Sequence, residues 1–132
     1  MKFTQAYSAC TVCSPTRASV MTGKYPARLH LTDWIAGHVR PYAKLKVPDW
    51  TMHLPLEETT IAETLKQIGY ATASIGKWHL GATPEFGPAL RGFDEVFGFL
   101  GRGAHDYFKL DDPNDPIYRG TTPVHETGYL TD

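Results

Sequence analysis

The sequence has no long apolar run and no concentration of positive charge. No stretch approaches the ~20 apolar residues that a membrane-spanning helix needs, and the first residues, Met1 to Gln5, lack the apolar centre of a secretory signal. The 13 Lys and Arg residues are scattered singly, and the formal net charge is -1 at pH 7. Nucleic-acid backbones and anionic membranes attract clustered cations. We therefore expect neither nucleic acid nor a membrane as a partner.

Cysteine is scarce as well. The chain has only Cys10 and Cys13, which cannot form a disulfide framework, so the cysteines do not indicate whether the protein resides in an oxidising or a reducing compartment. Their C-x-x-C spacing is also typical of thioredoxin-like proteins, so a redox protein that uses Cys10 and Cys13 is one functional hypothesis. With 42% hydrophobic and 20% charged residues over 132 positions, the composition fits one modest globular domain or a piece of a larger one.

Proline and glycine are plentiful and divide the chain into short pieces. The 10 Pro and 12 Gly predict long connections between a few regular elements. Residues 3–9 partly alternate between apolar and polar, which favours a strand. Residues 24–58 contain four prolines without sustained periodicity and predict a long ordered loop. Residues 95–100 favour a second short strand, whereas residues 111–132 are polar and rich in turn formers.

A helix is predicted directly after Cys13. Ser14 is a good N-cap residue, Pro15 suits the first helical position, and Gly23 is a natural stop. Cys13 would then lie just before the helix, where amide N–H groups without helical partners stabilise anions. Arg17 follows one turn later and can reach back to the same end of the helix.

A second helix is predicted after residue 60. Residues 60–63, Thr-Ile-Ala-Glu, fit a capping box, in which the first and last side chains bond each other's backbone N–H. Ile61, Leu65 and Ile68 then fall on one face, and Gly69 ends the helix.

A short buried strand is predicted next, over residues 70–75, with Gly76 as its stop. A helix that runs into a strand through a glycine turn is half of an α/β unit. Such folds place ligands just past the carboxyl ends of their strands. Lys77 and His79 occupy that position.

Two segments resemble the motifs of the sulfatase family. Residues 13–23, Cys-Ser-Pro-Thr-Arg-Ala-Ser-Val-Met-Thr-Gly, match the pattern of Cys or Ser, any residue, Pro, Ser or Thr, Arg, three residues, an apolar position, Thr and Gly. Chance would produce this match on the order of 10⁻⁸ times per starting position. Residues 69–81 resemble the second motif, which ends in Gly-Lys-Trp-His-Leu-Gly. Shorter similarities to bacterial enzymes of the arylsulfatase and N-acetylgalactosamine-6-sulfatase type extend over nearly the whole chain.

The resemblance implies an α/β fold and a larger parent protein. The expected architecture is a partial alkaline phosphatase-like sandwich, with a mixed sheet between flanking helices. Residues 1–132 would be a fragment of a sulfatase catalytic domain, and the intact parent would be periplasmic or secreted. An incomplete sheet leaves unpaired edges and a small core. We therefore expect the isolated chain to be marginally stable and without turnover.

The resemblance also implies a reaction, the hydrolysis of a sulfate monoester of a small molecule or a sugar. In the family a formylglycine-generating enzyme oxidises the motif cysteine to the aldehyde formylglycine. This makes Cys13 the expected nucleophile, with Pro15 and Arg17 in the recognition sequence for the modification. Arg17 and Lys77 are expected to bind the sulfate, and His79 the nucleophile hydroxyl. Calcium is the implied metal. Of the metal ligands known in the family, this chain has a match only for one, Cys13, and only after its conversion to formylglycine.

Several alternatives remain open from the residues alone. A phosphonate or phosphate monoester hydrolase of the same superfamily shares the Cys-x-Pro-x-Arg element, and a non-catalytic binding remnant would carry an unconverted Cys13. His105 and Asp106 are either a substrate contact or a hydrogen-bonded loop pair. Residues 111–115 resemble a calcium loop in composition but lack the glycine and the final glutamate of an EF-hand, which favours a solvated turn.

Overall fold

The computed structural model describes residues 1–37, 42, 44–101 and 103–131. Regular structure in this part of the chain is sparse and comprises α1 (Cys13–Thr22), α2 (Ile61–Gln67), β1 (Ala73–Lys77), β2 (Glu95–Phe99), β3 (Ile117–Arg119) and β4 (Thr122–Val124). Short 3₁₀ turns lie between them, namely η1 (Pro26–Leu29), η2 (Pro84–Phe86) and η3 (Pro88–Leu90). None of the described helices is long and apolar enough to cross a membrane.

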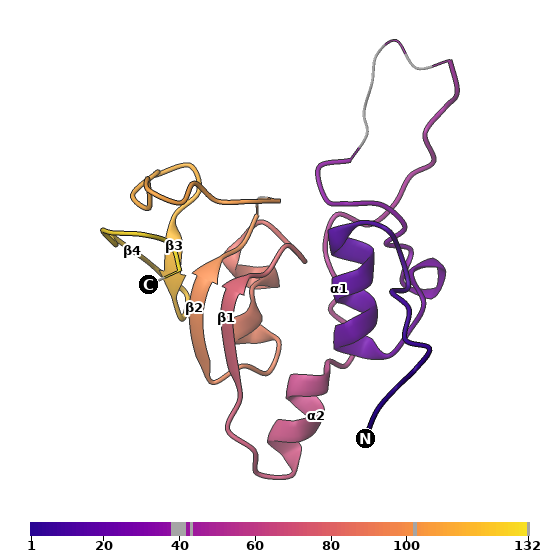
Figure 1. Ribbon diagram of the computed structural model, residues 1–132, viewed down its shortest axis with the longest axis horizontal. Helices are drawn as coiled ribbons and strands as arrows, with labels where there is room; N and C mark the ends of the chain where they lie inside the picture. The colour runs from indigo at the N-terminus through magenta and orange to yellow at the C-terminus, as the bar shows by residue number, and fades with distance from the viewer. Residues whose placement is uncertain (38–41, 43, 102, 132) are drawn as a thin grey trace.

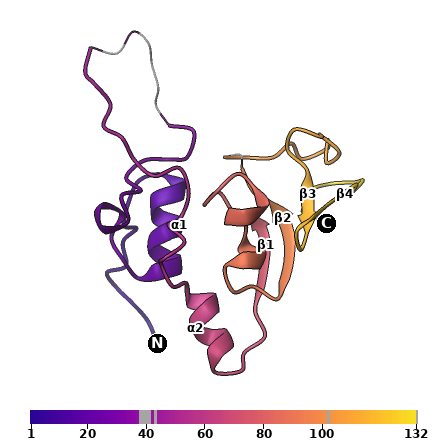
Figure 2. The ribbon, with the colours of Figure 1, turned by 180° about the vertical axis from the view of Figure 1, so that it is seen from behind.

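The strands form one mixed sheet in the order β1-β2-β3-β4. β1 and β2 are parallel, whereas β3 and β4 each run antiparallel to the strand before them. β1 is the strand nearest to α1, and β4 lies at the far edge of the sheet (Figure 1). The view from behind shows the short turns that follow β1 lying against one face of the sheet (Figure 2). The mixed α/β arrangement expected from the motifs is therefore present.

Helix α1 begins two residues earlier than predicted. Cys13 is its first residue, and the N-cap position belongs to Val12, which has no polar side chain. The prediction that Ser14 caps the helix is wrong because its hydroxyl has another partner. Ser14 Oγ accepts the backbone N–H of Ile35 at 3.1 Å and so ties a distant loop to the helix. Gly23 ends the helix as predicted, with a left-handed φ of 70°.

The capping box of α2 is confirmed, and two of the three apolar residues on one face of the helix are exposed. Thr60 Oγ1 accepts the N–H of Glu63 at 3.1 Å, and Glu63 Oε2 accepts the N–H of Thr60 at 2.6 Å. Ile61 and Ile68 are 52% and 70% exposed, whereas Ala62 is buried. Only a small side chain fits on the buried side, because Gly92 approaches so closely that an added Cβ would lie 2.4 Å from the backbone nitrogen of Glu63.

The strand after α2 differs from its prediction in both extent and burial. It covers Ala73–Lys77 rather than residues 70–75, and Ile75 is 82% exposed at the edge of the described sheet. Gly76 does not stop the strand. It lies opposite Gly98 in the parallel register, where a Cβ on Gly98 would come within 1.9 Å of the Gly76 carbonyl oxygen. The paired glycines thus permit a close approach of the two backbones.

The remaining strand predictions have mixed outcomes. The strand expected at residues 95–100 is present as β2. Residues 3–9, all of them described, form no strand. The hairpin of β3 and β4 was missed in the polar tail, where Gly120 turns the chain with a φ of 63°. Residues 24–58 form the predicted long connection with η1 inside it, although positions 38–41 and 43 of that prediction lie outside the described residues.

A small apolar core lies between α1 and the segment that follows β1. It contains buried residues from both motif regions, from the long connection and from just past the end of β2, namely Ala18, Leu29, Leu31, Leu54, Trp78, Leu80 and Leu100. A second cluster beside β2 and β3 contains Phe99, Leu110 and Ile117. Burial of apolar surface is the dominant stabilising contribution in folded domains. The first cluster therefore holds the helix that carries Cys13 against the segment that carries His79.

Candidate active site

The two sequence motifs meet at Cys13 and His79. Cys13 Sγ lies 3.1 Å from His79 Nδ1, although the two residues are 66 positions apart. Cys13 is half-buried at the start of α1, and His79 is buried two residues after the end of β1. The site therefore joins a helix N-terminus to the carboxyl end of a parallel strand, as predicted for a ligand site in an α/β fold.

The backbone around His79 explains how its ring reaches α1. The N–H groups of Trp78 and His79 donate to the carbonyls of Phe99 and Leu100, each at 2.9 Å, so pairing continues beyond β1. His79 has a φ of 57°, in the left-handed region of backbone conformation that residues other than glycine rarely adopt. A strained backbone conformation of this kind persists only where the surrounding contacts hold it in place, and such conformations are frequent at functional sites.

Arg17 forms a second link between the motifs. It is one helical turn after Cys13 and therefore lies on the same face of α1. Its Nη1 donates to the backbone carbonyl of Lys77 at 2.7 Å. Burial lowers the pKa of Arg17 from its ordinary value, and the charge of a Cys13 thiolate opposes this change. A partly desolvated guanidinium thus lies beside the expected nucleophile.

Lys77 is the last residue of β1, and its side chain contacts the loop after β2. Its ammonium donates to the carbonyl of Gly103, in the loop after β2. That loop also lies close to the histidine ring, because a Cβ on Gly103 would be 3.9 Å from His79 Cε1. Sequence reasoning singled out His105 and Asp106 in this loop but missed Gly103, because a lone glycine in a turn-rich stretch offers no signal.

The electrostatic surroundings keep His79 neutral. Burial, followed by the positive charges of Lys77 and Arg17, lowers the pKa of His79 from 6.5 to about 4, whereas the backbone of Ile35 opposes the shift. Its Nε2 is buried and forms no hydrogen bond within the part of the chain that the structure describes. Near neutral pH the ring is therefore a neutral imidazole, and its Nδ1 can accept a hydrogen bond from the Cys13 thiol.

The other predicted substrate contacts have internal partners. The His105 ring is buried, with Nδ1 2.9 Å from the carbonyl of Asp106 and Nε2 2.8 Å from the carbonyl of Asp115. Asp106 Oδ1 accepts the N–H groups of Phe108 and Lys109, and these bonds lower its pKa. Neither ring nitrogen of His105 is left for a substrate. The arrangement matches the alternative interpretation, a hydrogen-bonded loop pair.

The described residues do not fit a calcium site on their own. Across residues 1–37, 42, 44–101 and 103–131, no three His, Cys, Asp or Glu side chains gather closely enough to hold a metal ion. In the acidic stretch at 111–115, Asp112 Oδ1 accepts the N–H of Asn114, as in a solvated turn. Cys10 and Cys13 are both free thiols.

Comparison with known proteins identifies the family. The family model described as Sulfatase matches residues 1–129. The chain belongs to the sulfatase family. Curated relatives include arylsulfatase G of Rattus norvegicus, 44% identical over 98 residues, and N-acetylgalactosamine-6-sulfatase of Mus musculus, 37% identical over 119 residues. These alignments cover 74% and 90% of this sulfatase chain but only 16% and 22% of the relatives, so the chain spans about a fifth of their length.

Solved structures agree with this assignment. The complex of Ps i-CgsB with k-i-k-neocarrahexaose has a TM-score of 0.76 and 31% identity, covering 95% of this chain and 29% of that one. BT4656 in complex with D-glucosamine-2-N,6-O-disulfate has a TM-score of 0.65 and 26% identity, covering 96% and 20%. The sulfatase chain therefore has part of the alkaline phosphatase-like fold that was expected from its motifs.

Proposed function

We propose that this chain carries the nucleophile segment of an enzyme that hydrolyses sulfate monoesters. The observation that supports this proposal is the contact of Cys13 Sγ with His79 Nδ1 at 3.1 Å. The contact joins the two sulfatase motifs, and the bond from Arg17 to the Lys77 carbonyl lies beside it. The C-x-x-C redox hypothesis explains neither link, because it requires only Cys10 and Cys13.

The proposed nucleophile is Cys13 after its conversion to formylglycine. A hydrated aldehyde offers two hydroxyls on one carbon. One can attack the sulfur of the ester and displace the alcohol, and the other can then lose its proton, so that the bond from carbon to the sulfate oxygen breaks and the aldehyde forms again. The position of Cys13 at the start of α1 suits this task, because unpaired amide N–H groups at a helix N-terminus stabilise an anion.

The neighbouring side chains would bind the sulfate and orient the nucleophile. Arg17 and Lys77 bring two positive charges to a partly buried site, where they stabilise negative charge that develops in the transition state. A neutral His79 accepts a hydrogen bond from the nucleophile at Nδ1 and so orients it.

We further propose a sulfated sugar as substrate, a formylglycine-generating enzyme as partner and calcium as metal. The sugar is suggested by BT4656 and Ps i-CgsB, whose structures contain a sulfated glucosamine and a neocarrahexaose. Family membership supports the modification and the metal. Within the described residues no three His, Cys, Asp or Glu side chains gather to hold a metal, so we infer that Cys13, once converted, would contribute one ligand and that the others would come from outside this segment.

The proposed modification is tested by mass spectrometry after coexpression with a formylglycine-generating enzyme. We expect conversion at Cys13 alone, its loss in Cys13→Ala, and a strong reduction in Pro15→Ala. Cys10→Ser is the matched control and should leave conversion unchanged. A chain in which Cys13 remains a thiol under conditions that convert a known sulfatase would contradict the proposal.

The proposed reaction is tested in the longer natural protein that contains this segment. We expect hydrolysis of p-nitrophenyl sulfate to exceed that of p-nitrophenyl phosphate, and Arg17→Ala or Lys77→Ala to lower kcat by about 10²–10³-fold. A preference for phosphate would favour the phosphomonoester alternative. Reduction of insulin that depends on both Cys10 and Cys13 would favour the redox alternative.

A further inference from the structure

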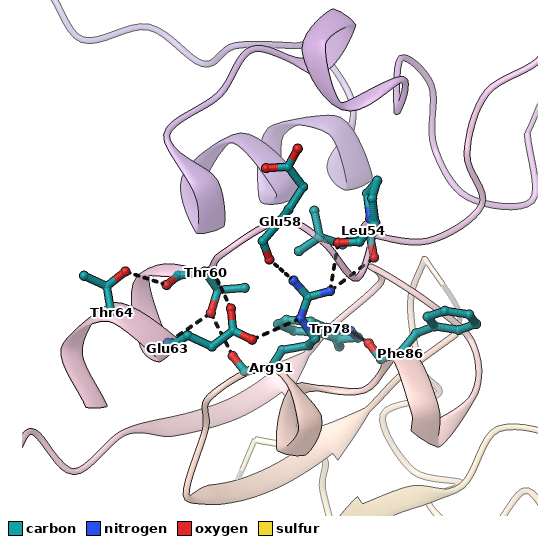
Figure 3. Close-up of polar contacts among 9 residues, drawn as sticks. Leu54, Glu58, Thr60, Glu63, Thr64, Trp78, Phe86 and Arg91 are labelled. Carbon is teal, nitrogen blue, oxygen red and sulfur yellow. Dashed lines mark hydrogen bonds and ion pairs between the residues drawn. The ribbon is translucent and has the colours of Figure 1, made fainter. Parts of the chain in front are cut away.

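A buried arginine occupies the junction between α2 and the long connection that precedes it. Arg91 is only 2% exposed, although its guanidinium carries a full charge. Nη1 donates to the carbonyls of Leu54 and Pro55 at 3.3 and 3.1 Å, and Nη2 donates to the carbonyl of Glu58. Figure 3 shows the guanidinium facing this loop. One side chain thus binds three carbonyls of the segment 54–58.

The charge of Arg91 is balanced by the capping box of α2. Glu63 Oε1 lies 3.7 Å from Arg91 Nε, while Oε2 of the same carboxylate accepts the N–H of Thr60 at 2.6 Å. The Thr60 hydroxyl donates to the Arg91 carbonyl at 2.8 Å, which closes a ring of contacts (Figure 3). A buried ion pair is a weak source of stability, and packed apolar side chains are often as good. We therefore assign to Arg91 the task of fixing the conformation of segment 54–58, in addition to filling space.

The segment 54–58 connects this ring to both halves of the active site. The N–H of Leu54 donates to the carbonyl of Leu80 at 2.9 Å, and Leu80 directly follows His79. At the other end of the segment, the Glu58 carboxylate pairs with Lys24, which follows the C-cap of the helix that carries Cys13.

We propose that Arg91 is a positioning residue for the pair Cys13 and His79. By binding three carbonyls of segment 54–58, it fixes the loop that contacts the end of α1 and the residue after His79. This inference rests on the proposed function for its catalytic consequence. The structural claim, that Arg91 holds Cys13 and His79 together, does not depend on the proposed function, because it can be tested in the chain whose Cys13 is still a thiol.

Arg91→Lys provides the direct test. Lysine keeps the charge, but its compact ammonium cannot reproduce the planar fork that binds the three carbonyls. We expect the rate at which iodoacetamide alkylates Cys13 to rise several-fold relative to Cys10, which serves as the reference thiol in the same chain. Glu63→Gln keeps the shape and the hydrogen bond to Thr60 but removes the charge partner, so a smaller rise is expected even if Arg91→Lys fails to fold.

Leu110→Ala is the matched control, because Leu110 is buried in the second apolar cluster beside β2 and β3. It should destabilise the chain without changing the alkylation ratio. In the longer natural enzyme, Arg91→Lys should lower kcat about 10-fold or more while KM changes less than about 3-fold, since small misplacements of catalytic groups are costly. Leu110→Ala should leave both constants near their original values.

Two results would overturn the positioning role. One is an unchanged alkylation ratio in folded Arg91→Lys and Glu63→Gln. The other is an equal rise in Leu110→Ala, which would assign the effect to general loss of stability. Failure of the proposed function gives a different result, because an enzyme without sulfatase activity would still show the change in alkylation.

Discussion

Replacing Lys77 by methionine should raise the pKa of His79. In the structure, burial is the largest cause of the lowered pKa, and the positive charge of Lys77 is the second. The gap between 6.5 and about 4 corresponds to at most roughly 3.5 kcal/mol at about 1.4 kcal/mol per pKa unit. Because burial persists in the variant, we expect Lys77→Met to recover only part of the gap. A pKa increase of about 0.5–1 corresponds to roughly 0.7–1.4 kcal/mol.

The pKa is measured by NMR titration of the histidine Cε1–H resonances. The His79 signal is assigned as the one that disappears in His79→Gln. Arg17→Met should raise the pKa by less than Lys77→Met does, because the charge of Arg17 is the smallest of the causes. Lys24→Met removes a positive charge that is paired with Glu58 and should have no effect.

The titration can refute this account in two ways. If Lys77→Met leaves the pKa near 4, the ammonium does not act on the ring, and the site geometry proposed above is wrong. If Arg17→Met has the larger effect, the guanidinium is the nearer charge, and the roles of the two cations are reversed.

Three further predictions concern stability. Thr60→Val leaves two buried backbone groups without a partner and should lower the free energy of unfolding by roughly 2–4 kcal/mol in urea, whereas equal losses in Thr60→Ser would exclude the hydroxyl as the cause. Ser14→Ala removes the acceptor of the Ile35 N–H and should cost roughly 1–3 kcal/mol, seen as a lower thermal midpoint; an unchanged midpoint would contradict this. Because the pKa of His79 is lowered on folding, its stabilising effect is complete above about pH 6.5 and decreases as the pH falls towards 4. We expect a loss of roughly 1–2 kcal/mol between pH 7 and 4.5, less than the full shift would give because the neighbouring Cys13, Arg17 and Lys77 are only half-buried, and His79→Gln should remove this dependence.

Local sequence signals predicted the features that depend on local chemistry. The capping box of α2, the glycine that ends α1 and the strand at residues 95–100 need only neighbouring residues, and all three are present. The proximity of Cys13 and His79 was expected only because two family motifs occur together. Their actual contact depends on the left-handed backbone at His79, which the sequence does not indicate.

Features that depend on distant partners were missed or misread. Ser14 has the chemistry of an N-cap, but the N–H of Ile35, 21 residues away, binds its hydroxyl instead. The apolar stripe of Ile61 and Ile68 does not mark the buried side of α2, because the close approach of Gly92 leaves room only for Ala62 there. Arg91 gave no local signal because its partners lie more than 25 positions earlier in the chain. Tertiary contacts of this kind override local propensity.

The wide spacing of the two motifs has a consequence for the newly made chain. Cys13 and His79 are 66 positions apart, so a ribosome that adds about 5–20 residues per second needs roughly 3–13 s to pass from one to the other. During that interval the thiol has been synthesised, but the ring that will contact it does not yet exist. Any enzyme that must reach the stretch from Cys13 to Arg17 while it is extended meets it unobstructed in these seconds.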